Sequence, residues 1–339
     1  MNLQRLCEGL RASRGFAHKR DIAEVMGTLT RSLPAMAQST VRVGDDCAAI
    51  PLDDGSGHLL FAMEGFVEDF VERMPWFAGY CGVMVNVSDI AAMGGRPLAV
   101  VDALWSAGAE AGRPIVEGLA AASERYGVPI VGGHSNHRSE RSQLAVAIVG
   151  RAKRLLTSFD ACAGDALVAA IDLRGAWQEP WPYWNASTEA PAERLRGDLE
   201  LLPQLAEQGL CRAAKDISMA GALGTLLMLL ECSGVGARVS IDRIPRPVAI
   251  PPGDDGALLR WLTAFPSYGF VLSVDPGAVD DVLERFTVRG IAAAEIGCIA
   301  PGSRLVLEHD GASALLWDHA IDPFICAPRT ATVGEAAHA

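Results

Sequence analysis

The stretch GYCGVMVNVSDIAAMGGRPLAVVDALW, residues 79–105, decides which fold this chain adopts. Its first part repeats apolar residues every three to four positions, a spacing that predicts a helix from about Phe77 to Met93. The run from Pro97 to Trp105 is apolar and predicts a β-strand after that helix. A long helix that leads into a strand is typical of layered proteins that contain both element types.

The segments on either side continue this alternation. The further elements predicted in the first half are strands within 41–51, 58–66, 128–131 and 144–149, and a helix over 115–126. Residues 1–40 are polar and predict an N-terminal arm and helix. We therefore expect a first domain over residues 41–153.

The second half begins after a connecting stretch, residues 151–165. Its predicted elements are a strand at 166–173, helices near 193–209 and 219–233, and strands at 237–241, 269–274 and 295–299. This pattern predicts a C-terminal αβ domain over 160–326, followed by a tail over 327–339. The fold class expected for the whole chain is α/β (α+β) with two domains.

Composition excludes several classes of protein. The 339 residues are 50% hydrophobic and 21% charged, which is enough apolar material for packed cores and too much for a disordered chain. The net charge of −12, without a cluster of Lys and Arg, argues against a nucleic-acid or anionic-membrane partner. We see no apolar run long enough for a secretory signal or a membrane span, and the eight cysteines form no CxxC pair. We therefore expect a soluble, cytoplasmic protein.

Acidic and polar residues gather at the ends of predicted elements in the first half. Gly44 permits a tight turn before Asp45 and Asp46, and Glu64 ends the next strand. Asp89 lies in an otherwise apolar helix, where a carboxylate is costly to bury unless it is paired or binds a metal. Each feature alone also fits a polar turn or a helix cap, but together they favour a site for Mg²⁺ and the phosphates of a nucleotide.

Several longer motifs carry a family resemblance. They are VGDDCAAI (43–50), AMEGFVEDF (62–70), GYCGVMVNVSDIAAMGGRP (79–97), IVGGHSN (130–136), AGDAL (163–167) and KDISMAGALGTLLMLLECSGVGARV (215–239). In these the chain resembles the aminoimidazole-ribonucleotide-synthetase-like superfamily, which includes thiamine-monophosphate kinase and selenophosphate synthetase. With DISMAG and FPSYGF (265–270), it is most similar to an uncharacterised synthase-related branch.

The resemblance implies a two-domain fold and a homodimer in which the N-terminal mixed sheets join into a barrel. It further implies ATP and Mg²⁺ as cofactors and a small-molecule substrate. The metal-side residues it implies are Asp45, Asp46, Glu64, Asp89 and Asp216. The nucleotide-side residues are Gly44, Asn86, Gly132, Gly133, His134 and Asn136. The expected function is an ATP- and Mg²⁺-dependent enzyme that uses the γ-phosphoryl group to phosphorylate or activate a metabolite.

Departures from the family pattern leave alternatives open. Met219 replaces an acid of the kinase branch, Cys81 replaces a basic residue, and His134 stands where that branch has an aspartate. These departures weaken the alternative of a phosphotransferase like thiamine-monophosphate kinase or selenophosphate synthetase, but that alternative stays open. The loss of functional groups at Met219 and Cys81 makes a non-catalytic, ATP-binding regulatory dimer a further alternative. ATP turnover would separate the enzyme from the regulator.

Two further features suggest roles near the ligand. The lysines are Lys19, Lys153 and Lys215, and we expect Lys19, with His134, to stabilise charge on the transferred phosphoryl group. Lys19 lies in a segment that corresponds to a flexible arm in related enzymes, although it could equally be a solvated surface lysine. WQEPWPYW (177–184) predicts an aromatic loop that either packs on the body or covers a flat ligand.

Overall fold

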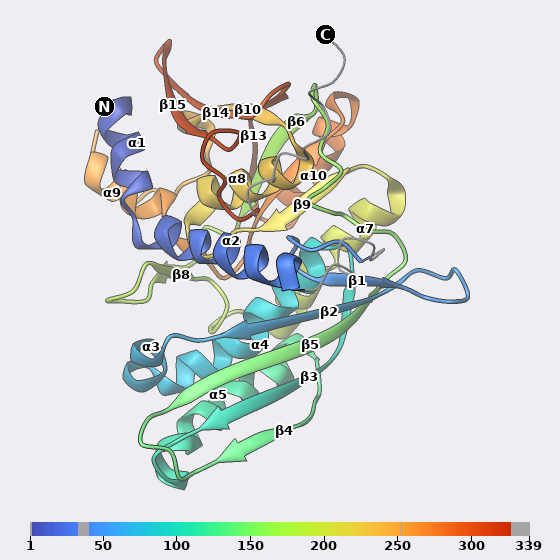
Figure 1. Cartoon of the computed structure of the whole chain (residues 1–339), viewed down its shortest axis with the longest axis vertical. Coiled ribbons are helices and arrows are strands. Elements are labelled where there is room, and N and C mark those ends of the chain that lie inside the picture. The colour runs from blue at the N-terminus through green and yellow to red at the C-terminus, as the bar shows by residue number, and fades with distance from the viewer. Residues whose placement is uncertain (1, 33–40, 252, 327–339) are drawn as a thin grey trace.

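The computed structural model describes residues 2–32, 41–251 and 253–326. Two large β-sheets, one in each half of the chain, build most of the molecule, and helix α2 (Arg14–Ser32) crosses between them (Figure 1). A third, small sheet has three short strands. Mixed helix and strand content in both halves confirms the α/β class. Among the described helices, none has the length and apolarity needed to cross a bilayer.

The first sheet has five strands in the order β1-β2-β5-β3-β4. They are β1 (Ala48–Pro51), β2 (His58–Gly65), β3 (Arg96–Trp105), β4 (Ile130–Asn136) and β5 (Gln143–Ala152). Strands β3 and β4 are parallel, which requires a crossover, and helix α5 (Ala109–Tyr126) supplies it. Helices α4 (Pro75–Ala92) and α5 pack on one face, preceded by the short α3 (Glu68–Arg73).

The second sheet has seven strands in the order β15-β14-β10-β13-β6-β12-β9. They are β6 (Ala166–Ile171), β9 (Ala213–Asp216), β10 (Gly236–Ser240), β12 (Gly269–Val274), β13 (Ala292–Ala300), β14 (Arg304–His309) and β15 (Ala312–Asp318). Its helices are α6 (Ala192–Leu199), α7 (Leu201–Gln208), α8 (Gly221–Ser233), α9 (Asp255–Leu262) and α10 (Val279–Val288). Helix α8 packs in the core on one side of this sheet, and α7 and α10 pack in the core on the other.

Helix α4 belongs to both halves. Every residue from Phe77 to Ala92 is buried, as expected for a helix that is apolar on all sides. Most of its side chains join the core of the first sheet, but Ala91 and Ala92 pack with α7 and the second sheet. The stretch that predicted the fold is thus also the element that joins the two halves.

The N-terminal segment is helical over its described residues, in agreement with the predicted helix. Helix α1 (Leu3–Arg11) precedes α2, and Phe16 on α2 is fully buried against Trp317 and Phe324. A side chain at Gly15 would come within 2.6 Å of the Ala220 backbone, so a glycine is required where α2 approaches the start of α8.

Other departures from the sequence expectations concern short or late elements. The predicted helix at 219–233 begins at Gly221, because Ala220 has a left-handed φ of 112°. WQEPWPYW is a small hairpin, since β7 (Ala176–Trp177) and β8 (Tyr183–Asn185) pair with each other and β8 pairs with β11 (Phe265–Pro266). Strands β14 and β15 and helices α9 and α10 were not predicted.

The expected barrel is not closed within one chain. The first sheet is open in the described residues, with β1 and β4 at its edges. The divisions at 1–40, 41–153 and 160–326 stay predictions, and the expected tail over 327–339 lies outside the described residues.

Candidate functional site

Three carboxylates from distant parts of the chain converge between the two sheets. Asp46 precedes β1, Asp89 lies in the last turn of α4, and Asp216 ends β9. One carboxylate oxygen from each lies within 4.8 Å of the others. The Asp89 Oδ2 atom is buried and has no hydrogen-bond partner. Such a set fits a hard divalent cation such as Mg²⁺, which prefers oxygen ligands.

Burial makes the negative charges of this cluster unfavourable without a cation. Loss of solvent raises the pKa of Asp89 well above its usual range, and the carboxylates of Asp216, Glu64 and Asp46 raise it further. The pKa of Asp216 is raised in the same way by burial and then by Asp46, and Lys215 and Lys19 partly oppose the shift. A bound cation would relieve this repulsion.

Lys215 lies inside the cluster, a position that the sequence did not reveal. The residue is 3% exposed, and its Nζ donates to Asp46 and lies 3.9 Å from Asp45 Oδ1. Burial disfavours the ammonium, but Asp46 and Asp45 outweigh that effect and raise the pKa of Lys215. The sequence contained one signal for this position: Lys215 directly precedes Asp216 in the stretch AAKD, which forms a buried strand.

Asp45 holds the loop rather than facing the other carboxylates. Its Oδ2 accepts from the Ser158 amide at 2.8 Å, and its Oδ1 accepts from the Ser158 hydroxyl at 2.6 Å. The amide of Asp46 also donates to Asp45 Oδ1 at 3.0 Å. Gly44 has a φ of 121°, which permits the turn, and its carbonyl accepts from the Cys232 thiol. This loop presents Asp46 to the cluster.

Two adjoining cavities open beside the cluster. The larger, of about 640 Å³, is lined by the Val41–Asp46 loop, and the smaller measures about 280 Å³. Six residues line both: Lys19, Ile22, Glu64, Asp89, Asp216 and Ser218. Lys19 and Glu64 thus border the carboxylates from α2 and from the end of β2. The larger cavity falls in the size range of small-ligand sites.

The other predicted residues line neither cavity. Asn86 is buried, and its Nδ2 donates to the carbonyls of Gly82 and Val146. Gly132, Gly133, His134 and Asn136 lie on the exposed edge strand β4. By strand register, Gly132 lies in one cross-strand row with Val101 and Met63, and Met63 lines the larger cavity. The open face of the first sheet therefore continues into that cavity.

The aromatic hairpin divides its side chains between two environments. Trp177 and Trp184 pack edge-on with Trp261 in the core of the second half. Trp181 and Tyr183 instead pack against Phe70, and Tyr183 lines the smaller cavity.

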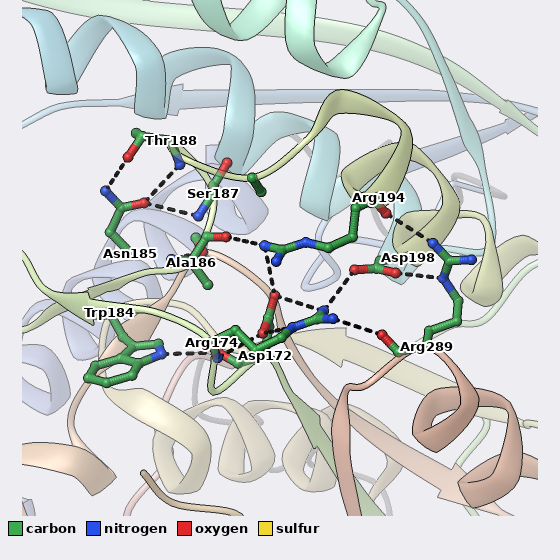
Figure 2. A network of polar contacts seen from close by, with 12 residues as sticks. Asp172, Arg174, Trp184, Asn185, Ala186, Ser187, Thr188, Arg194, Asp198 and Arg289 are labelled. Carbon is green, nitrogen blue, oxygen red and sulfur yellow. Dashed lines mark hydrogen bonds and ion pairs between the residues drawn. The ribbon is translucent and has the colours of Figure 1, made fainter. Parts of the chain in front are cut away.

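A buried polar network fixes this hairpin to the second sheet (Figure 2). The Trp184 indole donates to the Asp172 carbonyl at 3.0 Å, and the Asp172 side chain pairs with Arg174 and Arg194. Arg194 also donates to the Ala186 carbonyl at 2.7 Å. Because Ala186 directly follows β8, these contacts hold the strand that carries Tyr183.

The chain is similar to known proteins over most of its length. Residues 44–152 match the family model described as AIR synthase related protein, N-terminal domain, and residues 156–310 match the corresponding C-terminal domain. An uncharacterized protein of Synechocystis sp. is 47% identical over 310 residues, which cover 91% of this chain and 94% of that protein. One of Methanocaldococcus jannaschii is 32% identical over 330 residues, 96% of this chain and 99% of that protein. A selenide, water dikinase of Myxococcus xanthus is 26% identical over 251 residues, 70% of each.

Solved structures share the fold at low sequence identity. T. maritima PurL complexed with ATP has a TM-score of 0.66 and 20% identity, and the match covers 83% of this chain and 46% of PurL. AaThiL complexed with AMPPCP and TMP has a TM-score of 0.65 and 19% identity, with 86% of this chain and 96% of that protein covered.

Proposed function

The chain belongs to the family of AIR synthase related proteins, and we propose that it is an ATP- and Mg²⁺-dependent enzyme that acts on a small metabolite. It would use the γ-phosphoryl group either to phosphorylate the metabolite or to activate one of its oxygens. The observation that carries the proposal is the convergence of Asp46, Asp89 and Asp216 beside a cavity of about 640 Å³. The ATP and AMPPCP named for the similar structures support a nucleotide as the occupant.

The three carboxylates would hold Mg²⁺, with Glu64 bordering the site. When bound, the ion supplies positive charge that neutralises the β- and γ-phosphates. Asp45 and Ser158 keep the loop in place, and Lys215 holds the Asp46 carboxylate at the cluster.

Lys19 supplies the mobile positive charge in this proposal. It projects from α2 into the space shared by the two cavities, where an ammonium can approach the transferred group. The acceptor oxygen would bond to the γ-phosphorus as the bond to the ADP oxygen breaks. Catalysis would rest mainly on positioning and charge neutralisation.

A homodimer would complete the nucleotide site. The uncovered face of the first sheet exposes Phe61, Met63 and Val101, of which Met63 is 67% exposed. Gly132 and His134 pair with Val101 and Ala103 and so share this face. A second copy seated here would bury the apolar face, close the barrel and bring the β4 residues to the larger cavity.

Binding and turnover of Mg·ATP test the proposal. Mg·AMPPCP should raise the melting temperature of the wild type. At a ligand concentration of a hundred times Kd, binding adds about 2.7 kcal/mol to the free energy of unfolding. Asp89→Asn should abolish the Mg²⁺-dependent part of that shift, whereas Asp53→Asn, at an exposed position, should not. ADP release with a metabolite panel would establish an enzyme. Tight binding without turnover would favour the regulatory dimer, and no binding would refute the proposal.

A further inference from the structure

The smaller cavity, of about 280 Å³, is built on one stripe of helix α4. Phe77, Cys81, Met84 and Val85 line it at helical spacing, and Asp89 follows on the same stripe. At a rise of about 1.5 Å per residue, Cys81 lies roughly 12 Å along the helix from Asp89. The cavity thus runs from an apolar inner end to the carboxylates.

Aromatic rings form the wall opposite this stripe. Phe70 on α3 meets Tyr183 on β8 edge-on at a centroid distance of 5.0 Å, and it meets Phe77 at 6.0 Å. Tyr183 in turn meets Phe265 on β11 at 5.8 Å and 89°. The wall is therefore continuous over three elements, and the network around Asp172 holds the strand that contributes Tyr183 (Figure 2).

The charges around the cavity are confined to one side. Among the described residues that line it, the basic side chains are His18 and Lys19, both on α2. The carboxylates are Glu64, Asp89 and Asp216, at the end shared with the larger cavity. Apart from Asp89 at the shared end, helices α3 and α4 and strands β8 and β11 contribute neutral side chains, namely Phe70, Cys81 and Phe265 among others. A phosphate on the inner part of a ligand would lack the Arg or Lys that such groups require.

We propose, on the basis of the ATP-dependent function above, that the acceptor is a small molecule with an uncharged aromatic or heteroaromatic ring. The ring lies between the aromatic wall and the Cys81 stripe, and the reacting oxygen points toward Lys19. An apolar cavity of about 150 Å³ holds benzene, so 280 Å³ accommodates one ring with a short substituent or two fused rings. A sugar phosphate is disfavoured, because Lys19 is the one Arg or Lys among the described residues that line this cavity, and it lies at the end shared with the larger one.

Binding of simple probes tests this acceptor class. Benzyl alcohol and indole represent the ring, and ribose 5-phosphate and glycerol 3-phosphate represent phosphate-bearing acceptors. Saturation-transfer NMR titrations of the full-length protein, with and without Mg·AMPPCP, give the affinities. We expect the ring probes to bind and the phosphate probes to bind at least tenfold more weakly.

Two variants locate the bound probe. Cys81→Phe fills the inner end of the cavity and should weaken ring binding at least tenfold, while Cys298→Phe, at an exposed strand position, should leave it unchanged. Cys81 does not line the larger cavity, so Mg·AMPPCP binding serves as the folding control. If Cys81→Phe fails to fold, Phe265→Leu removes one edge contact and should weaken ring binding about two- to tenfold.

The outcomes separate this inference from the proposed function. Three results would overturn the proposed acceptor class. The phosphate probes bind more tightly than the ring probes, the ring probes do not bind, or Cys81→Phe and Phe265→Leu both leave the affinity for the ring probes unchanged. Failure of the wild type to bind Mg·AMPPCP would instead overturn the nucleotide function on which the inference rests. Ring binding that is lost in Cys81→Phe and kept in Cys298→Phe supports both the cavity and its ligand class.

Discussion

Replacing Lys215, the buried lysine of the carboxylate cluster, should lower the free energy of unfolding, because its ammonium contacts the buried carboxylates. Lys215→Met keeps an unbranched side chain that is one heavy atom shorter, but it removes the ammonium that contacts Asp46 and lies 3.9 Å from Asp45 Oδ1. Removal of one partner of a buried ion pair costs about 3–5 kcal/mol, because the remaining charge stays buried without compensation. With an unfolding entropy of about 2.1 cal/mol/K per residue over 339 residues, this is a loss of roughly 4–7 °C in Tm.

The assay is scanning calorimetry in slightly alkaline buffer, first with excess EDTA and then with millimolar Mg²⁺. The divalent ion should recover part of the lost stability, because it brings positive charge back to the same carboxylates. Lys153→Met is the matched control, since the side chain of Lys153 is 71% exposed and lies 3.9 Å from Glu207. A surface pair of this kind contributes at most about 1 kcal/mol.

Two results would refute this reasoning. If Lys215→Met has the same Tm as the Lys153→Met control, the ammonium of Lys215 does not compensate the charge of the buried carboxylates. An equal loss with and without Mg²⁺ would mean that Asp46, Asp89 and Asp216 do not bind the ion.

Further predictions address the other parts of the site. Lys19→Ala should lower turnover of Mg·ATP by about 100-fold with little change in Tm, and unchanged steady-state kinetics would exclude its role. Phe61→Asp on the open sheet face should convert a dimer to a monomer in analytical ultracentrifugation, and a dimer that persists would place the interface elsewhere. Asp45→Ala removes the acceptor for two Ser158 donors and should cost about 2–3 kcal/mol in a denaturant titration; an unchanged midpoint would contradict its anchoring role. Asp172→Asn weakens the pairing with Arg174 and Arg194 and should lower Tm by several degrees, with calorimetry as the check.

Much of the fold followed from local patterns. The helix near Phe77–Met93 and the strand at 97–105 correspond to α4 and β3, because both have strong apolar periodicity. The strands after residue 300 were missed, since short pieces of irregular polarity carry little periodic signal. Helix α8 begins at Gly221, two residues later than predicted, because Ala220 has a left-handed backbone conformation. Helix propensities do not predict that conformation for an alanine.

The candidate site was predicted unevenly. Asp46, Asp89 and Asp216 do converge, because each is a carboxylate at the end of an apolar element, where isolated burial would be costly. Lys215 was passed over, since a single lysine in a strand does not reveal which residues face it. The β4 residues line neither cavity of one chain, so their predicted role depends on a second copy. Asn86 also lines neither cavity, because it is buried within α4 and donates to the carbonyls of Gly82 and Val146.

The amino-acid sequence by itself determined the family, the two mixed αβ halves and the acidic motifs, because these depend on residue type and spacing along the chain. Only the tertiary structure decided that Lys215 pairs with Asp46 in the cluster, that the Asp45 carboxylate accepts hydrogen bonds from Ser158 and that an aromatic cavity adjoins Asp89. The first two relations join residues 169 and 113 positions apart, and the cavity combines residues from α3, α4, β8 and β11. Distances of that kind are set by how the two sheets pack on α4 and α2, and local sequence does not encode them.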